Sequence, residues 1–159
     1  MKTEPNTYSM VDLLKGKNGG CWDGVRNFQA RNFLRDMEAG DLALIYHSSV
    51  KVPHVAGVGE IVGKWYPDPT QFDPQSPYFD PRTARMDKEL VRLGNAWISR
   101  DLRAVDNFLT PISIGELRAN KKLEKMKMLE RGSRLSITPL TGHEFEEILK
   151  MVKEKMKKQ

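Results

Sequence analysis

The segment 21–34, CWDGVRNFQARNFL, combines an indole ring, an Asp-Gly turn, arginines, asparagines and a glutamine within a short distance. Trp22 can stack on a flat ring, and the turn at Asp23-Gly24 can present backbone amides. Arg26 and Asn27 carry the forked donors and the donor–acceptor pair that read base edges or phosphates. Together these residue types favour a pocket that binds a flat polar ring.

Two further polar residues, His47 and Ser48, stand at the end of a predicted strand and can converge on the same pocket. A structural interpretation of the same residues stays open. In it Trp22 is a core residue, Arg26 pairs with a carboxylate and Asn27 caps a helix. The residue types alone support the two interpretations about equally.

Covalent and metal chemistry have little support in the sequence. Cys21 is the only cysteine, and neither it nor any serine lies in a known nucleophile signature with one of the three histidines. The aspartates of segment 66–81 lack calcium-loop or zinc spacing, and their Pro-Asp-Pro context is typical of turns. We therefore expect a binding protein without catalytic residues, metal or cofactor.

The elements that must position these residues alternate between helix and strand. Apolar residues at helical spacing predict an amphipathic helix within 23–40, and segments 41–49 and 54–66 read as strands. The proline- and aromatic-rich segment 66–81 is predicted to be an ordered loop. Segments 96–108 and 131–140 are predicted strands, the first fitting a short helix about as well. Capping boxes open helices at Ser113 and Thr141. This order predicts an α+β fold with a small curled sheet.

The bulk properties are those of a compact globular protein. We expect residues 1–159 to form a single domain, without a membrane span or signal, located in the cytoplasm, or in the nucleus if the source is eukaryotic. A monomer is the favoured state. The lysine-rich end, about 150–159, holds four of the five net positive charges, and it is more typical of a solvated helix end than of a nucleic-acid-binding arm.

Five motifs in order, KTEP…YS, CWDGVRNFQARNFL, GDLALIYHSS, VAGVGEIVGKWYPDPTQFD and SRLSITPLT, resemble the EVE-domain family. The match runs from about Lys2 to Ile148. The resemblance implies a PUA-like fold, a small mixed β-barrel flanked by helices, related to YTH and ASCH domains. It implies binding of a modified base, with modified cytosine in DNA as the leading ligand, and no established catalysis.

Carried over position by position, the resemblance implies a base-binding pocket drawn from several segments. Its residues would be Lys2, Thr3, Glu4, Trp22, Val25, Arg26, Asn27, His47, Ser48 and Ser136. A base turned out of its stack costs a few kcal/mol, which stacking and edge hydrogen bonds can offset. We expect Arg31, Arg35 and Arg134, with the lysine-rich end, to contact phosphates.

The resemblance also implies an aromatic strand, Y-W-L, directly before KTEP. This chain starts at Met1, so either that strand is absent or the start is misassigned; an absent strand would leave one barrel edge and part of the pocket wall incomplete. On this reading alanine at Trp22 or Asn27 abolishes discrimination between modified and plain oligonucleotides and leaves the fold intact. Modified RNA is the alternative ligand. A nucleotide-modifying enzyme or nuclease-associated accessory protein, with His47 or Glu4 as acid or base, is the rival function.

Overall fold

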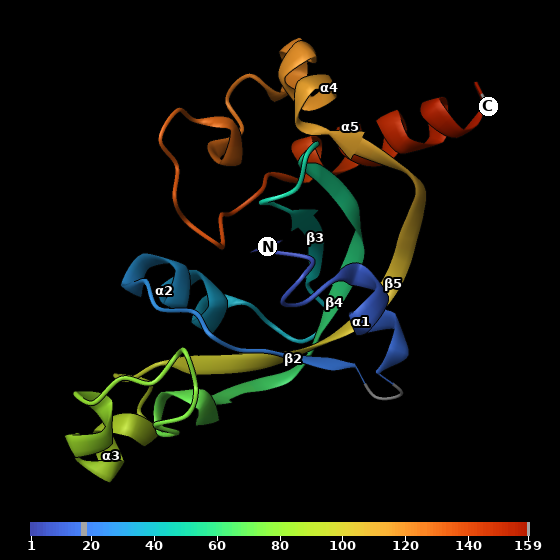
Figure 1. The fold of residues 1–159 in the computed structure, drawn as a ribbon. Helices are drawn as coiled ribbons and strands as arrows, with labels where there is room; N and C mark the ends of the chain where they lie inside the picture. Colours follow the sequence, from blue (N-terminus) through green and yellow to red (C-terminus); the bar gives the residue numbers. More distant parts are fainter. Residues whose placement is uncertain (17–18, 159) are drawn as a thin grey trace.

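The computed structural model describes residues 1–16 and 19–158 as one five-stranded sheet with helices against both faces (Figure 1). The strands are β1 (Lys2–Thr3), β2 (Gly20–Trp22), β3 (Leu42–His47), β4 (His54–Pro67) and β5 (Ile98–Ser113). The helices are α1 (Met10–Lys15), α2 (Phe28–Asp36), α3 (Lys88–Arg92), α4 (Ile114–Ala119) and α5 (Gly142–Met156). The mixed α+β class is as predicted.

The sheet has the strand order β1-β3-β4-β5-β2, and only β1 runs parallel to its neighbour, β3. The long central strands β4 and β5 shift register three times, and such irregularities bend and twist a sheet. At Gly57 a β-carbon would lie 2.3 Å from the carbonyl oxygen of Asp106, so the close approach requires glycine. In the described residues β1 and β2 are not paired with each other, so the predicted closure into a barrel is not confirmed.

Each face of the sheet covers its own core, as the alternation along β3 shows. Ile45 joins the cluster that packs against α1 and α2, whereas Leu44 and Tyr46 join the cluster that packs against α4 and α5. Trp22 and Val25 belong to the first cluster, directly beside the start of α2. The segment of greatest chemical interest in the sequence is therefore anchored in a core.

Most predicted elements are confirmed, with one correction. Both capping boxes are present, all but the first two residues of the 96–108 segment lie within β5, and the proline-rich segment is ordered around a short 3-10 helix, Pro69–Gln71. The predicted strand at 131–140 is wrong. That segment runs as an extended loop without ladder pairing, and the backbone N–H of Lys2 donates to the Ser136 carbonyl at 2.7 Å.

A pH-sensitive ion pair between Glu116 of α4 and Lys155 of α5 links these two helices. Partial burial opposes ionisation, but hydrogen bonds from Lys155 and Ser113 prevail and lower the pKa of Glu116 to about 2. A lowered carboxyl pKa stabilises the fold above the unfolded value and loses that contribution as pH falls toward 2. We expect the urea concentration at the midpoint of unfolding to decrease as the pH is lowered from about 4.5 to about 2. The decrease should be smaller in Glu116→Gln. An equal pH response in Glu116→Gln and in the exposed-site control Glu146→Gln would contradict this assignment.

Candidate functional site

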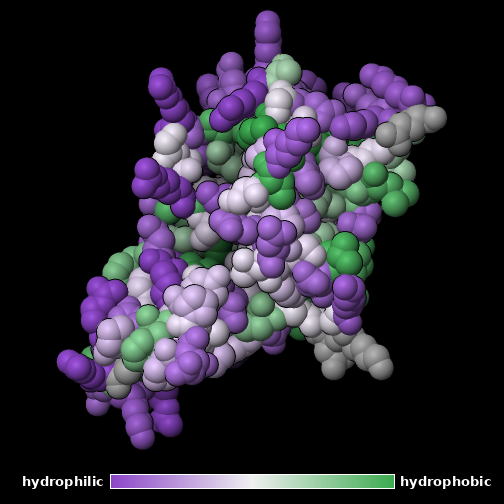
Figure 2. Space-filling view, in the orientation of Figure 1, coloured by the Kyte–Doolittle hydropathy of each residue, from purple (hydrophilic) through white to green (hydrophobic). Residues whose placement is uncertain are grey.

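A cavity of about 700 Å³ opens between the two edge strands of the sheet. This volume lies within the range of small-molecule sites. Figure 2 shows the surface hollowed between α2 and the segment that precedes α5. The lining comes from five separate stretches of chain: Lys2, Thr3, Glu4, Thr7, Tyr8, Gly20, Cys21, Trp22, Asp23, Gly24, Val25, Ser48, Tyr78 and Ser136. Because β1 and β2 stand at opposite ends of the strand order, the curl of the sheet forms the cavity.

One wall is built by the pairing of β1 with β3. The register sets Thr3 beside His47, so the next residue, Ser48, donates both its backbone N–H and its hydroxyl to the Thr3 carbonyl, at 2.8 and 3.1 Å. The Glu4 side chain accepts from the Ser49 hydroxyl at 2.9 Å. These hydrogen bonds fix the polar wall before any ligand binds.

The aromatic part of the cavity is formed by Trp22 and Tyr8, whose rings meet edge to face with centroids 6.1 Å apart. Gly20 permits this approach, since a β-carbon there would lie 1.6 Å from the Tyr8 hydroxyl. Trp22 is only 6% exposed, and its indole N–H donates to no other residue in the described part of the chain. This N–H is not among the fully buried unpaired atoms, so at the cavity wall it is available to a ligand.

The third part, Tyr78, is held in place by a hydrogen-bonded hub around Asp68. The buried Asp68 carboxylate accepts from the Gly24 backbone at 2.9 Å and from Arg26 at 2.7 Å, while Arg26 also donates to the Tyr78 carbonyl at 2.7 Å. Gly24 has φ of +71°, and a β-carbon there would meet the Tyr78 ring at 2.8 Å. The hub therefore clamps the proline-rich loop over the Trp-Asp-Gly turn.

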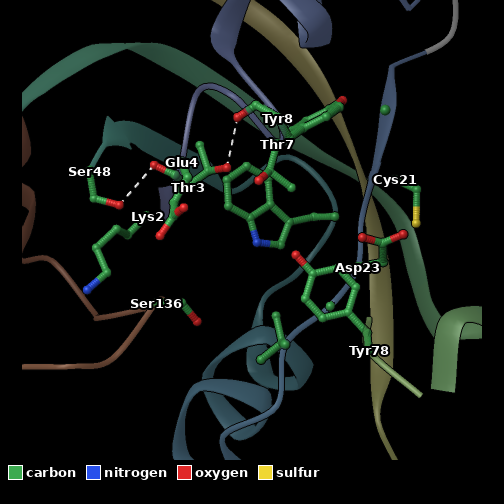
Figure 3. A pocket seen from close by; sticks show the side chains of 14 residues that line it. Lys2, Thr3, Glu4, Thr7, Tyr8, Cys21, Asp23, Ser48, Tyr78 and Ser136 are labelled. Carbon is green, nitrogen blue, oxygen red and sulfur yellow. Dashed lines mark hydrogen bonds between the residues drawn. The ribbon is translucent and has the colours of Figure 1, made fainter. Parts of the chain in front are cut away.

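Charge inside the cavity is mixed and slightly acidic. Figure 3 shows Lys2, Glu4 and Ser48 on one side and Asp23 with the Tyr78 hydroxyl on the other. Partial burial, then the nearby Asp68 carboxylate, raise the pKa of Asp23, and Arg26 opposes them. The two carboxylates and one ammonium group leave the interior better suited to a base that carries an amino group than to a phosphate.

Seven of the ten residues predicted for the pocket line the cavity: Lys2, Thr3, Glu4, Trp22, Val25, Ser48 and Ser136. The structure does not bring the other three, Arg26, Asn27 and His47, to the cavity wall. Arg26 is engaged in the hub, the Asn27 side chain caps α2 by accepting from the Ala30 N–H at 3.1 Å, and the His47 Nε2 accepts from the Met10 N–H at 3.0 Å. The hydrogen bonds of Arg26, Asn27 and His47 within the protein give each of these side chains a structural role that needs no ligand.

Of the arginines predicted to contact phosphates, Arg31 is engaged inside the protein. It is 9% exposed, donates to the carbonyls of Asn95 and Ala96, and lies over the Phe28 ring. Arg134 is exposed two residues from the cavity wall. Arg35 is half-buried at the far end of α2, 4.0 Å from Asp36.

Sequence reasoning missed Tyr8, Cys21 and Tyr78 as lining residues, and named Asp23 only as a turn former. The sequence does contain signals for two of them: Tyr8 belongs to the KTEP…YS motif, and Asp23 sits between two lining residues. Tyr78 could not be found this way, because only the hub brings the proline-rich loop to the turn.

The structure offers little for catalysis or metal binding. Burial, followed by the charge of His54, lowers the pKa of His47, which keeps this histidine neutral as an acceptor. Burial raises the pKa of Cys21, so its thiol is not activated. Within 1–16 and 19–158 no three histidine, cysteine or acidic side chains gather as metal ligands, and no helix there is long and apolar enough to cross a membrane.

Comparison with known proteins matches this fold and site to a family. The EVE domain model matches residues 1–151. Thymocyte nuclear protein 1 of Homo sapiens is 37% identical over 169 residues, covering 95% of this chain and 72% of the human protein. A Pseudomonas syringae crystal structure has a TM-score of 0.85 at 41% identity, covering 96% of this chain and 97% of its own.

A solved human structure is also similar to this chain. The human THYN1 protein in complex with 5-methylcytosine-containing DNA has a TM-score of 0.83 and 35% identity, covering 96% of this chain and 95% of that one. The family match extends over nearly the whole sequence, including every residue that lines the cavity. The chain belongs to the EVE domain family.

Proposed function

We propose that this protein is a non-catalytic DNA-binding module that recognises a modified cytosine by taking the base into the cavity between β1 and β2. The observation that carries the proposal is the largely buried indole of Trp22, whose N–H has no hydrogen-bond partner among the described residues, beside the carboxylate of Asp23 in a cavity of about 700 Å³. The human relative bound to 5-methylcytosine-containing DNA supports the choice of ligand. The whole of 1–159 acts as one domain in this proposal.

Each polar group has a partner on cytosine. A carboxylate accepts a hydrogen bond from the exocyclic amino group at N4, so Asp23 selects cytosine by this edge. The Trp22 N–H donates to an acceptor of the ring, and Tyr78 adds an aromatic surface with a hydroxyl at its end. The apolar Val25 side chain offers contact for a methyl group at position 5.

The energetics allow a base to leave its stack for this site. Extrusion costs a few kcal/mol, and each stacking or bidentate edge contact returns about 1 to 3 kcal/mol. The wall of Thr3 and Ser48 and the hub around Asp68 are already hydrogen-bonded, so little further ordering opposes binding. Rigid walls also favour discrimination of one small substituent.

Fluorescence polarisation with oligonucleotides that differ at one cytosine tests the proposal. Plain, 5-methyl and 5-hydroxymethyl forms, each as DNA and as RNA, are compared at two salt concentrations. We expect a modified DNA to bind about tenfold more tightly than plain DNA at both salts, the size expected for one buried edge contact or methyl group. Equal affinities for all oligonucleotides would refute base recognition, and preference for the RNA series would reassign the ligand to modified RNA.

A further inference from the structure

The segment 118–134 carries as much net positive charge as the whole chain. It contains seven basic residues and two acidic ones: Arg118, Lys121, Lys122, Lys125, Lys127, Arg131 and Arg134, against Glu124 and Glu130. The whole chain has a net charge of +5. We call residues 118–134 the basic segment. The remaining surface, apart from the lysine-rich end of α5, is acidic on balance.

The basic side chains of this segment point into solvent. Only Lys122 forms an ion pair across the described residues, to Glu147 at 3.0 Å. Lys127, Arg131 and Arg134 are exposed and unpaired within that same part of the protein. Buried Leu123 and Met126 anchor the segment in the second core. The charges are thus presented by an ordered backbone and are free to meet an anion.

The basic segment leads directly to the rim of the cavity. Arg134 is two residues from Ser136, which lines the cavity and accepts from the Lys2 backbone N–H at 2.7 Å. In Figure 1 this stretch, drawn in orange, descends from α4 toward the N-terminus, and Figure 2 shows hydrophilic side chains along the same side. A chain that enters the cavity with one base must leave its neighbouring phosphates near this rim.

The other basic region lies elsewhere. The lysines at the end of α5 are separated from its start at Gly142 by roughly 16 to 24 Å of helix rise, and Figure 1 shows the C-terminus on the opposite side from the basic segment. Lys155 there is engaged with Glu116 at 2.8 Å. The cavity interior holds two carboxylates, which disfavour a phosphate inside it.

We propose that the basic segment, rather than the lysine-rich end of α5, binds the phosphate backbone of the DNA strand whose base occupies the cavity. The inference rests on the proposed function for its choice of DNA. Arg134 and Arg131 contact phosphates beside the inserted nucleotide, and Lys127 contacts one farther along. The base is read inside the cavity and the backbone is held outside it, which separates specificity from salt-dependent affinity.

Two triple variants of equal charge test this division. Lys127→Ala/Arg131→Ala/Arg134→Ala alters the basic segment, and Lys153→Ala/Lys157→Ala/Lys158→Ala alters exposed residues of the α5 end. Binding of 5-methylcytosine DNA and of matched plain DNA is measured from 50 to 200 mM salt, with circular dichroism and thermal unfolding as fold controls. Three lost phosphate contacts, at about 0.9 each on duplex DNA, should reduce the salt slope by about 3 and weaken both DNAs by about 500-fold at 0.1 M salt.

The results distinguish this proposal from the proposed function. The expected result is an unchanged ratio of methylated to plain binding in the segment variant, with the α5 variant within about twofold of wild type. Loss of the salt slope in the α5 variant, or equal loss in both variants, would overturn the backbone assignment and leave the base pocket standing. If wild type binds both DNAs with equal affinity while the basic-segment variant loses its salt dependence, recognition of the base in the cavity is refuted. The assignment of the basic segment to the phosphate backbone then stands.

Discussion

Asp68→Ala is expected to lower the free energy of unfolding by about 3 to 5 kcal/mol, measured by urea denaturation. The Asp68 side chain is fully buried and accepts hydrogen bonds from the Gly24 N–H, from Arg26, and from the backbone and hydroxyl of Thr70. Alanine would leave the Arg26 guanidinium, 21% exposed, without its counter-charge and the Gly24 amide without an acceptor. Breaking one partner of a buried pair costs more than the pair itself contributes.

The matched control is Asp73→Ala in the same loop. The Asp73 side chain is exposed and, among the described residues, accepts only a local hydrogen bond from the Gln75 N–H, so this variant should lose less than about 1 kcal/mol. Asp68→Asn keeps the size of the side chain and should fall between the two. A loss below about 1 kcal/mol in Asp68→Ala would show that the hub does not hold the loop, and Tyr78 would then need another anchor.

Local signals in the sequence sufficed for much of the fold. The Ser113–Glu116 and Thr141–Glu144 capping boxes start helices where predicted, because a capping box depends only on residues within one turn. The barrel and the 131–140 strand depended on long-range pairing. Nothing in RGSRLSITPL reveals that its Ser136 carbonyl would accept from the Lys2 N–H, across most of the chain length.

The sequence predicted which residues gather at the site better than it predicted the partner that each of them binds. Arg26 and Asp68 are 42 residues apart in sequence and meet at 2.7 Å, so the contact that removes Arg26 from the pocket is invisible without the fold. Asn27 was open to both a capping and a reading role, and the structure gives it the first. Residue type determines which hydrogen bonds a side chain can form, whereas the fold determines which partner it has.

Trp22 illustrates the same limit. The sequence predicted that Trp22→Ala would leave the fold intact, but the ring is 94% buried in the first core cluster. Truncating a buried tryptophan to alanine costs about 3 to 5 kcal/mol, so that variant confounds recognition with unfolding. The indole N–H must be tested with Trp22→Phe, which keeps an aromatic ring in the core.

Asp23→Asn is expected to collapse discrimination between 5-methylcytosine and thymine, two bases that share the 5-methyl group. Cytosine presents its N4 amino donor to Asp23, whereas thymine presents the O4 acceptor, which a carboxylate repels. An asparagine amide can present either an oxygen or an NH₂ group, so it accommodates both bases. The wild-type preference of about 10- to 100-fold, one good edge contact, should fall toward unity, measured by competition binding with otherwise identical DNAs.

The stability of Asp23→Asn should stay within about 0.5 kcal/mol of wild type, because the residue is exposed on the cavity wall and its neighbour Arg26 is committed to Asp68. Asp36→Asn, an exposed acidic site at the end of α2, makes the same charge change away from the cavity and should keep the preference. Trp22→Phe removes one donor common to both bases, so it should weaken both alike and preserve their ratio. A preference that survives Asp23→Asn but disappears in Trp22→Phe would move the reading of the base edge from the carboxylate to the indole.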